Sequence, residues 1–107
     1  MITIGTSGFD YADWRGFFYP EKLPKTAWLE YYSRYFSSLE LNFSYYRMPS
    51  ASNLESMVKR TDGKVKFSIK CHRSMTHERI ASDLDYDNFN EALKPVRESS
   101  CLGAVLA

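Results

Sequence analysis

The sequence predicts an α/β fold built from parallel βα repeats, and three observations support this prediction. Four short apolar runs have the composition of strands, at residues 2–6, 38–43, 65–72 and 102–107. Stretches with helical periodicity separate them, and successive strands begin roughly 30 residues apart, the length of a βα unit. Such alternation implies a parallel sheet with helices packed on it. Two architectures fit this pattern: an open doubly wound sheet, or the first part of a (β/α)₈ barrel.

Each stretch between the predicted strands carries its own helix signals. After Pro24, large apolar side chains recur at the spacing of one helix face, at Trp28, Leu29, Tyr32, Tyr35 and Phe36. A second helix is expected to begin at residues 49–50, where a serine hydroxyl can cap free backbone N–H groups, and to end at residues 62–63. A third is expected to begin near Asp87. Pro95 should kink or shorten it because proline lacks a backbone donor.

The fourth predicted strand, residues 102–107, has no helix after it. An apolar strand of a parallel sheet needs neighbours on both edges and cover on both faces. A (β/α)₈ barrel of about 250 residues uses about 31 per unit, so 107 residues correspond to three units and a fourth strand. We therefore expect residues 1–107 to form one domain, the N-terminal part of a barrel truncated at its C-terminus. Its open sheet edges offer a route to self-association.

Composition excludes several classes of protein. Hydrophobic residues make up 44% of the chain and charged residues 25%, which is typical of globular proteins rather than disordered ones. No apolar run approaches the ~18 residues of a membrane span, and the N-terminus lacks the basic start and apolar stretch of a signal peptide. Two cysteines, Cys71 and Cys101, form no disulfide framework. We expect a cytoplasmic protein without a membrane partner, in which both cysteines are small buried apolar residues.

The net charge of +1 is unevenly divided along the chain. Residues 1–46 carry four basic and five acidic side chains, residues 47–79 eight and three, and residues 80–107 two and five. The basic central segment favours an anionic ligand, and a solvated helix face is the structural alternative. A nucleotide- or nucleic-acid-binding module using residues 47–79 is therefore our alternative function. Nucleic acid is less favoured, because the sequence contains no recognisable nucleic-acid motif.

Polar and apolar side chains alternate along the second and third predicted strands. Period two places Glu40 and Asn42 on one face of the second strand, and Lys70 and His72 on one face of the third. If the apolar sets meet the helices, the polar sets point into the barrel and gather at the carboxyl ends of the strands, where barrel enzymes keep their active sites. Glu40 beside Lys70 would then be an ion pair kept for function or a tuned acid–base pair. A polar plug inside the barrel is the structural alternative.

These residue types suggest catalytic roles. We expect Glu40 to act as acid or base, Asn42 to orient the substrate or Glu40, and Lys70 to stabilise an anion. His77, in the loop after the third strand, is expected to transfer protons or bind substrate. No metal is assigned, because the spacing of Cys71 and the two histidines matches no strong ligand motif, and the sequence indicates no particular cofactor. A hydrolytic or lyase-like reaction on a small anionic or sugar-like compound suits these groups.

Five further residues are candidates for substrate binding: Ser7, Trp14, Tyr46, Arg47 and His72. Ser7 lies in a glycine-flanked turn whose N–H groups could meet an anion. A plain tight turn is the alternative, since the turn lacks the dinucleotide and P-loop fingerprints. Trp14 belongs to an aromatic stretch, residues 9–19, that could cover the barrel mouth and stack on a sugar-like ligand. Packing on the first helix explains the same residues equally well.

Short motifs run through the whole chain in a fixed order: IGTSGF at residues 4–9, WRG at 14–16, FYP at 18–20, LEYY at 29–32, ELN at 40–42, YRMP at 46–49, FSIK at 67–70, TH at 76–77 and LGAVL at 102–106. With them the chain resembles the YecE-like family, number seventy-two in the series of domains of unknown function. The resemblance implies a (β/α)₈ barrel of about twice this length or more. It implies fold rather than activity, so we expect the first part of an uncharacterised barrel enzyme, inactive by itself.

The chain departs from the family pattern at two positions. Phe9 stands where family members usually have tryptophan, and Phe43 where many carry a small polar residue. Neither departure involves the four predicted catalytic residues.

Overall fold

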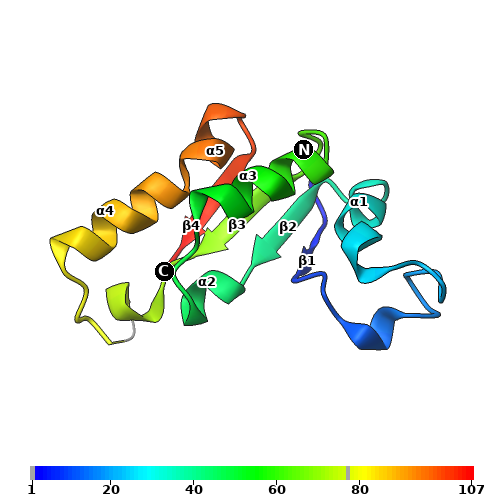
Figure 1. Cartoon of the computed structure of the whole chain (residues 1–107), viewed down its shortest axis with the longest axis horizontal. Helices are drawn as coiled ribbons and strands as arrows, with labels where there is room; N and C mark the ends of the chain where they lie inside the picture. The colour runs from blue at the N-terminus through cyan, green and yellow to red at the C-terminus, as the bar shows by residue number, and fades with distance from the viewer. Residues whose placement is uncertain (1, 77) are drawn as a thin grey trace.

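The computed structural model describes residues 2–76 and 78–107, and its centre is a four-stranded sheet (Figure 1). The strands are β1 (Thr6–Ser7), β2 (Ser38–Leu41), β3 (Lys66–Lys70) and β4 (Leu102–Leu106). They lie in the order β1-β2-β3-β4, and each neighbouring pair is parallel. Helices occupy the segments between the strands, so the predicted α/β fold with parallel βα repeats is confirmed.

The strand order agrees with one of the two architectures that the sequence left open, the partial barrel. A doubly wound sheet reverses its winding direction at a switch point, whereas the described strands follow one another without reversal. Since crossovers between parallel strands are right-handed, winding in one direction places the helices on one face of the sheet. Figure 1 shows α3 running across the front of the strands, and α4 and α5 pack beside α3. The described strands therefore wind as consecutive units of a barrel do.

The helical segments are η1 (Ala12–Trp14), η2 (Lys25–Ala27), α1 (Trp28–Ser33), α2 (Phe43–Tyr46), α3 (Ala51–Arg60), η3 (Arg73–Met75), α4 (Asp83–Ala92) and α5 (Lys94–Glu98). The second predicted helix, α3, is confirmed at its start, because the Ser50 hydroxyl accepts a hydrogen bond from the N–H of Asn53 at 3.2 Å. The third divides in two around Leu93, and Pro95 lies in the first turn of α5. There its missing N–H would be unpaired in any case.

Several predicted boundaries are wrong, among them the end of β3, which lies at Lys70 rather than at residue 72. β1 begins at Thr6 rather than residue 2, because only Thr6 and Ser7 pair with β2. Ile2 and Ile4 remain exposed. β2 ends at Leu41, since Asn42 precedes the short helix α2, which the sequence did not reveal. α4 starts four residues before Asp87, behind a capping box in which Ser82 and Asp85 satisfy each other's backbone N–H groups.

The alternation predicted for β2 and β3 is confirmed by burial. Leu39 and Leu41 of β2, with Phe67 and Ile69 of β3, are buried in one core with side chains of α1, α3, α4 and α5. Burying each such side chain contributes roughly 1.5–3 kcal/mol. The residues between them on both strands are half-buried or exposed. The sheet therefore has an apolar face covered by helices and a polar face on the other side.

The aromatic residues after β1 pack on α1 and form a cluster of their own. The Tyr19 ring stacks on Trp28 with centroids 4.5 Å apart, and Phe18 makes edge contacts with Tyr31 and Tyr32. Tyr19 is fully buried and donates its hydroxyl to the carbonyl of Phe9 at 2.7 Å. Burial, with the nearby Tyr32 and Asp10 groups, raises the pKa of Tyr19 well above its usual range.

Both cysteines are free thiols. Cys101 is buried in the core, as predicted, whereas Cys71 is only half-buried and packs against that core. Burial raises the pKa of the Cys71 thiol, so this thiol is less reactive than an exposed one. Over the described residues, every helix is too short or too polar to cross a membrane.

Candidate functional site

The polar face of the sheet brings together side chains from the carboxyl ends of neighbouring strands. Ser7 of β1 is the register partner of Glu40 on β2, and Glu40 is in turn the partner of Ser68 on β3. Register partners on parallel strands point to the same side of the sheet, about 4.8 Å from strand to strand. A hydroxyl, a carboxylate and a second hydroxyl thus form a row across three strands.

Short hydrogen bonds hold the ends of these strands together. The side-chain amide of Asn42 donates to the Ser7 hydroxyl oxygen at 2.5 Å, and the N–H of Gly8 donates to the carbonyl of Glu40 at 2.8 Å. The buried hydroxyl of Ser44, in α2, donates to the carbonyl of Lys70 at 2.5 Å. The Asn42 side chain was predicted to lie on the polar face. It bridges to β1 from the residue immediately before α2.

The predicted pairing of Glu40 with Lys70 is wrong. The register places Glu40 opposite Ser68, so Lys70 lies two residues farther along β3, about 6.6 Å beyond that point. The Lys70 ammonium lies instead over the Tyr45 ring, 4.9 Å from its centroid, a cation–π contact. Among the residues that the structure describes, Lys70 and Glu40 make no ion pair with each other.

Of the two histidines, His72 lies two residues after the end of β3 and caps η3. Its Nδ1 accepts the backbone N–H of Ser74 at 3.2 Å and lies 2.8 Å from the Ser74 hydroxyl. A nitrogen that accepts a backbone N–H carries no proton, so neutral His72 holds its proton on Nε2. That nitrogen is therefore the donor that this ring can present to a ligand. His77 lies outside the described residues, and its role stays a prediction.

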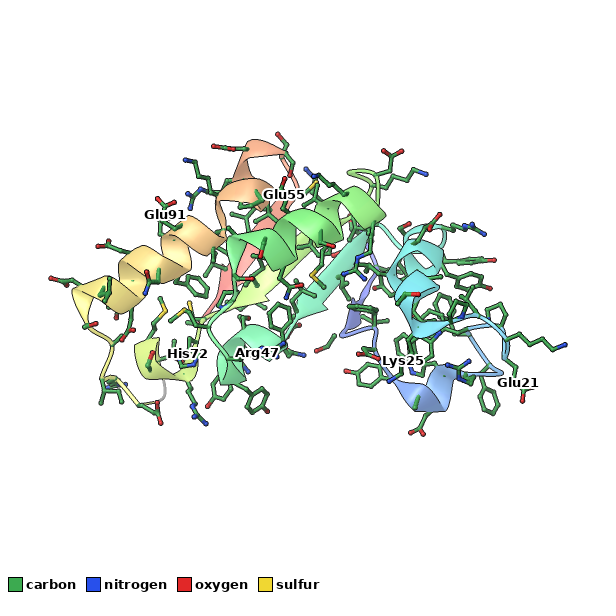
Figure 2. All side chains as sticks on the ribbon, in the orientation of Figure 1. Glu21, Lys25, Arg47, Glu55, His72 and Glu91 are labelled. Carbon is green, nitrogen blue, oxygen red and sulfur yellow. The ribbon has the colours of Figure 1, made fainter. Side chains whose placement is uncertain are left out.

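The remaining candidates have different surroundings. Trp14 packs in the aromatic cluster, with its ring centroid 5.0 Å from Tyr11 and 5.8 Å from Phe18. Its surroundings therefore agree with the packing interpretation. Tyr46 ends α2, Arg47 follows it, and both residues are exposed. Figure 2 shows Arg47, His72 and Lys25 along the same side of the molecule, the side toward which the strands point.

A groove of about 480 Å³ opens beside the carboxyl ends of β1 and β2. Asn42 and Arg47, both predicted from the sequence, contribute to its lining. Lys25 and Arg60 also line it, and sequence reasoning missed both because folding brings them together from separate helices. One signal was available: Asn53, Met57 and Arg60 have the i, i+4, i+7 spacing of one helix face.

The structure also bears on metal binding and on the basic segment, residues 47–79. Among residues 2–76 and 78–107, no three His, Cys, Asp or Glu side chains gather closely enough to hold a metal ion. The cations of residues 47–79 are distributed over α3, β3, η3 and the segments between these elements. Among the described residues, two of these cations form ion pairs: Lys59 with Glu55 at 3.2 Å, and Arg73 with Glu78 at 3.8 Å.

Comparison with known protein families places the chain in one of them. Residues 3–107 match the family described as "Protein of unknown function DUF72". The chain belongs to the DUF72 family. The resemblance identified from the sequence motifs is thereby confirmed. A curated relative, the UPF0759 protein YunF of Bacillus subtilis strain 168, is 34% identical over 112 residues, covering 99% of this chain and 39% of YunF.

Solved DUF72 structures share the fold. A DUF72 family protein from Thermotoga maritima MSB8 superposes with a TM-score of 0.81 at 35% identity, covering 100% of this chain and 44% of that one. A DUF72 family protein from Enterococcus faecalis V583 gives a TM-score of 0.76 at 22% identity, over 98% and 38% of the two chains. The chain thus spans less than half the length of these DUF72 relatives.

Proposed function

We propose that the polar face at the carboxyl ends of β1, β2 and β3 is part of the active site of a (β/α)₈-barrel enzyme that acts on a small anionic or sugar-like substrate. The row formed by Ser7, Glu40 and Ser68 carries this proposal. Strands of a parallel sheet covered on both faces are nearly all apolar. Polar side chains at their carboxyl ends occupy the position of barrel active sites.

Glu40 is the acid or base of the proposed site. It is half-buried, and among the described residues no side-chain hydrogen bond or ion pair occupies its carboxylate. Such a carboxylate is free to exchange a proton with a bound substrate, the step that hydrolytic and lyase reactions share. A hydrolytic or lyase reaction is proposed because the Glu40 carboxylate is available to a substrate and the Lys70 ammonium, farther along β3, can stabilise negative charge.

Asn42 and Lys70 support this chemistry in different ways. Because the Asn42 amide donates to the Ser7 oxygen, the Ser7 hydroxyl keeps its own proton to donate to a substrate oxygen or to Glu40. The Lys70 ammonium, held over Tyr45, stabilises an anionic group or a developing oxyanion. Tyr46, which ends α2, and His72, two residues after β3, contribute to substrate binding, whereas Arg47 lines the neighbouring groove. Trp14 belongs to the aromatic cluster that follows β1.

Gluconate is a suitable probe, because it combines a carboxylate with a chain of hydroxyls. Titrated into the ¹⁵N-labelled chain, it should shift amide signals at residues 7–8, 40–42 and 68–70. Glu40→Gln keeps the shape of the side chain but removes the charged acceptor, and should weaken binding about tenfold, the value of one charged hydrogen bond. Glu91→Gln makes the same charge change on the helix-covered side (Figure 2) and should leave binding unchanged. Equal affinities for both variants would refute the role of Glu40.

Nucleotide or nucleic-acid binding through residues 47–79 is the alternative, and the +5 balance of that segment supports it. The distribution of its cations over several elements disfavours a continuous phosphate track. The alternative predicts that affinity for a single-stranded oligonucleotide falls steeply as salt rises, because each phosphate contact releases counterions. An affinity that does not change with salt concentration would exclude this alternative function.

A further inference from the structure

The groove of about 480 Å³ meets the polar row at Asn42 and extends from there to the opposite face of the sheet. Leu41 contributes to its lining, and Leu41 points toward the helices while its neighbour Glu40 lies on the opposite face. Met57 and Asn53 line it from one face of α3. The groove therefore runs on the helix-covered side of the sheet and opens at the carboxyl ends of β1 and β2.

Three cationic side chains line this groove, and they come from different elements. Lys25 begins η2, Arg47 follows α2, and Arg60 ends α3. The residues described around the groove include a single carboxylate, Asp10, which lies 3.8 Å from the Lys25 ammonium. Among the described residues, neither guanidinium takes part in an ion pair. The lining thus carries three positive charges and one negative charge, a net charge of +2.

The walls between these charges are apolar and aromatic. Phe9, Phe43 and Met57 contribute them, and the Arg47 guanidinium lies over the Phe43 ring, 5.6 Å from its centroid. This stacking holds the planar guanidinium at the wall and leaves its edge N–H groups free for a ligand. The side-chain amide of Asn53 adds a neutral hydrogen-bonding group.

We propose that this groove is a binding site for a small phosphate monoester with an apolar or aromatic body. A phosphate monoester carries close to two negative charges at pH 7, which matches the net charge of the lining. Arginine binds phosphate oxygens with two parallel N–H donors, so Arg47 is the principal ligand. Lys25 lies along the same side of the molecule (Figure 2). Arg60 ends α3, seven residues and about 10 Å beyond Asn53. From that end of the groove its positive charge adds to the attraction of the phosphate. The apolar body packs against Phe43 and Met57.

Phenyl phosphate is the test probe, titrated into the ¹⁵N-labelled 107-residue chain. It should shift the amide signals of residues 43, 47, 53 and 57. Arg47→Gln should weaken binding about tenfold or more, as expected when one charged donor pair is lost. Arg73→Gln is the matched control, because it removes the same charge from a residue that pairs with Glu78 and does not line the groove. Unfolding curves of both variants establish that each is folded at the temperature of the titration.

Inorganic phosphate separates the contribution of the apolar wall from that of the charges. Phenyl phosphate should bind more tightly than inorganic phosphate, and Phe43→Leu should reduce this difference in affinity. Both results would support the proposed contacts between the apolar body of the ligand and the groove. Equal affinity for the two probes, equal loss in Arg47→Gln and Arg73→Gln, or no saturable shift at the groove would each overturn the proposal. Neither gluconate nor Glu40 enters this test, so its failure is distinguishable from failure of the proposed active site.

Discussion

Replacing Tyr32 by phenylalanine removes one hydroxyl on which the junction between β1 and β2 depends. The Tyr32 side chain is fully buried. Its hydroxyl accepts the backbone N–H of Thr6 at 3.0 Å, donates to the carbonyl of Ser38 at 2.8 Å and lies 2.9 Å from the Thr6 hydroxyl. Since β1 pairs with β2 through only two residue pairs, this side chain from α1 supplies much of what holds the first strand in place.

The expected loss of stability follows from these contacts. Each neutral hydrogen bond contributes about 1 kcal/mol net, and a stranded buried donor costs a further 1–3 kcal/mol or so. Thr6 is half-buried, so water can satisfy part of the loss. We therefore expect Tyr32→Phe to lower the free energy of unfolding by about 2–3 kcal/mol. The ring remains, so no cavity larger than a hydroxyl is left.

Urea unfolding followed by circular dichroism measures this loss. Tyr35→Phe is the matched control, because Tyr35 is 61% exposed and its hydroxyl makes only a 3.5 Å contact with Tyr31. That variant should stay within about 0.5 kcal/mol of the unmodified chain. Hydrogen exchange should also quicken at residues 6–8 in Tyr32→Phe. A change below about 0.5 kcal/mol, or an equal change in the control, would refute the reasoning.

Two further predictions use the same unfolding measurement. Gly5→Ala should lower the free energy of unfolding by at least about 2–3 kcal/mol, because a Cβ there would lie 2.0 Å from the carbonyl oxygen of Ser38. In the control, Gly16→Ala, the Cβ meets no atom within 4 Å, so only the strain of the positive φ should lower the stability, by about 1 kcal/mol. Similar losses of stability in the two variants would contradict the predicted clash. The raised pKa of Tyr19, caused first by burial, means that the folded chain keeps this proton while the unfolded chain loses it near pH 10. The free energy of unfolding should therefore decline as pH rises above about 10, and Tyr19→Phe should make the decline shallower; an unchanged slope would contradict this.

Much of the fold was predictable because its signals are local. Period two in residues 38–41 and 66–70 determines which side chains face the helices, and burial confirms those sides. Ser50 caps α3 as expected, because a cap involves only the next three residues. The start of β1 was not predictable. Ile2 and Ile4 have strand composition, but strand structure also requires a partner, and β2 offers one only to Thr6 and Ser7.

The faces on which the candidate side chains lie were predictable, but the pairings between them were not. Alternation placed Glu40 and Lys70 on the polar face, and both lie there. Their separation depends on the register between two strands, which is set by hydrogen bonds between segments almost thirty residues apart. The same holds for Asn42, whose bond to Ser7 spans 35 residues of sequence. Neither relation leaves a periodic signal within one segment.

By itself, the sequence determined the α/β class, the apolar and polar faces of the sheet, and the family to which the chain belongs, because each rests on patterns within short stretches. The tertiary structure alone decided the strand order, the row from Ser7 to Ser68 and the groove that joins Lys25, Arg47 and Arg60. These arrangements come from packing and register between distant segments. A one-dimensional pattern specifies which face a side chain occupies, whereas only the folded chain specifies its neighbour across a strand or a groove.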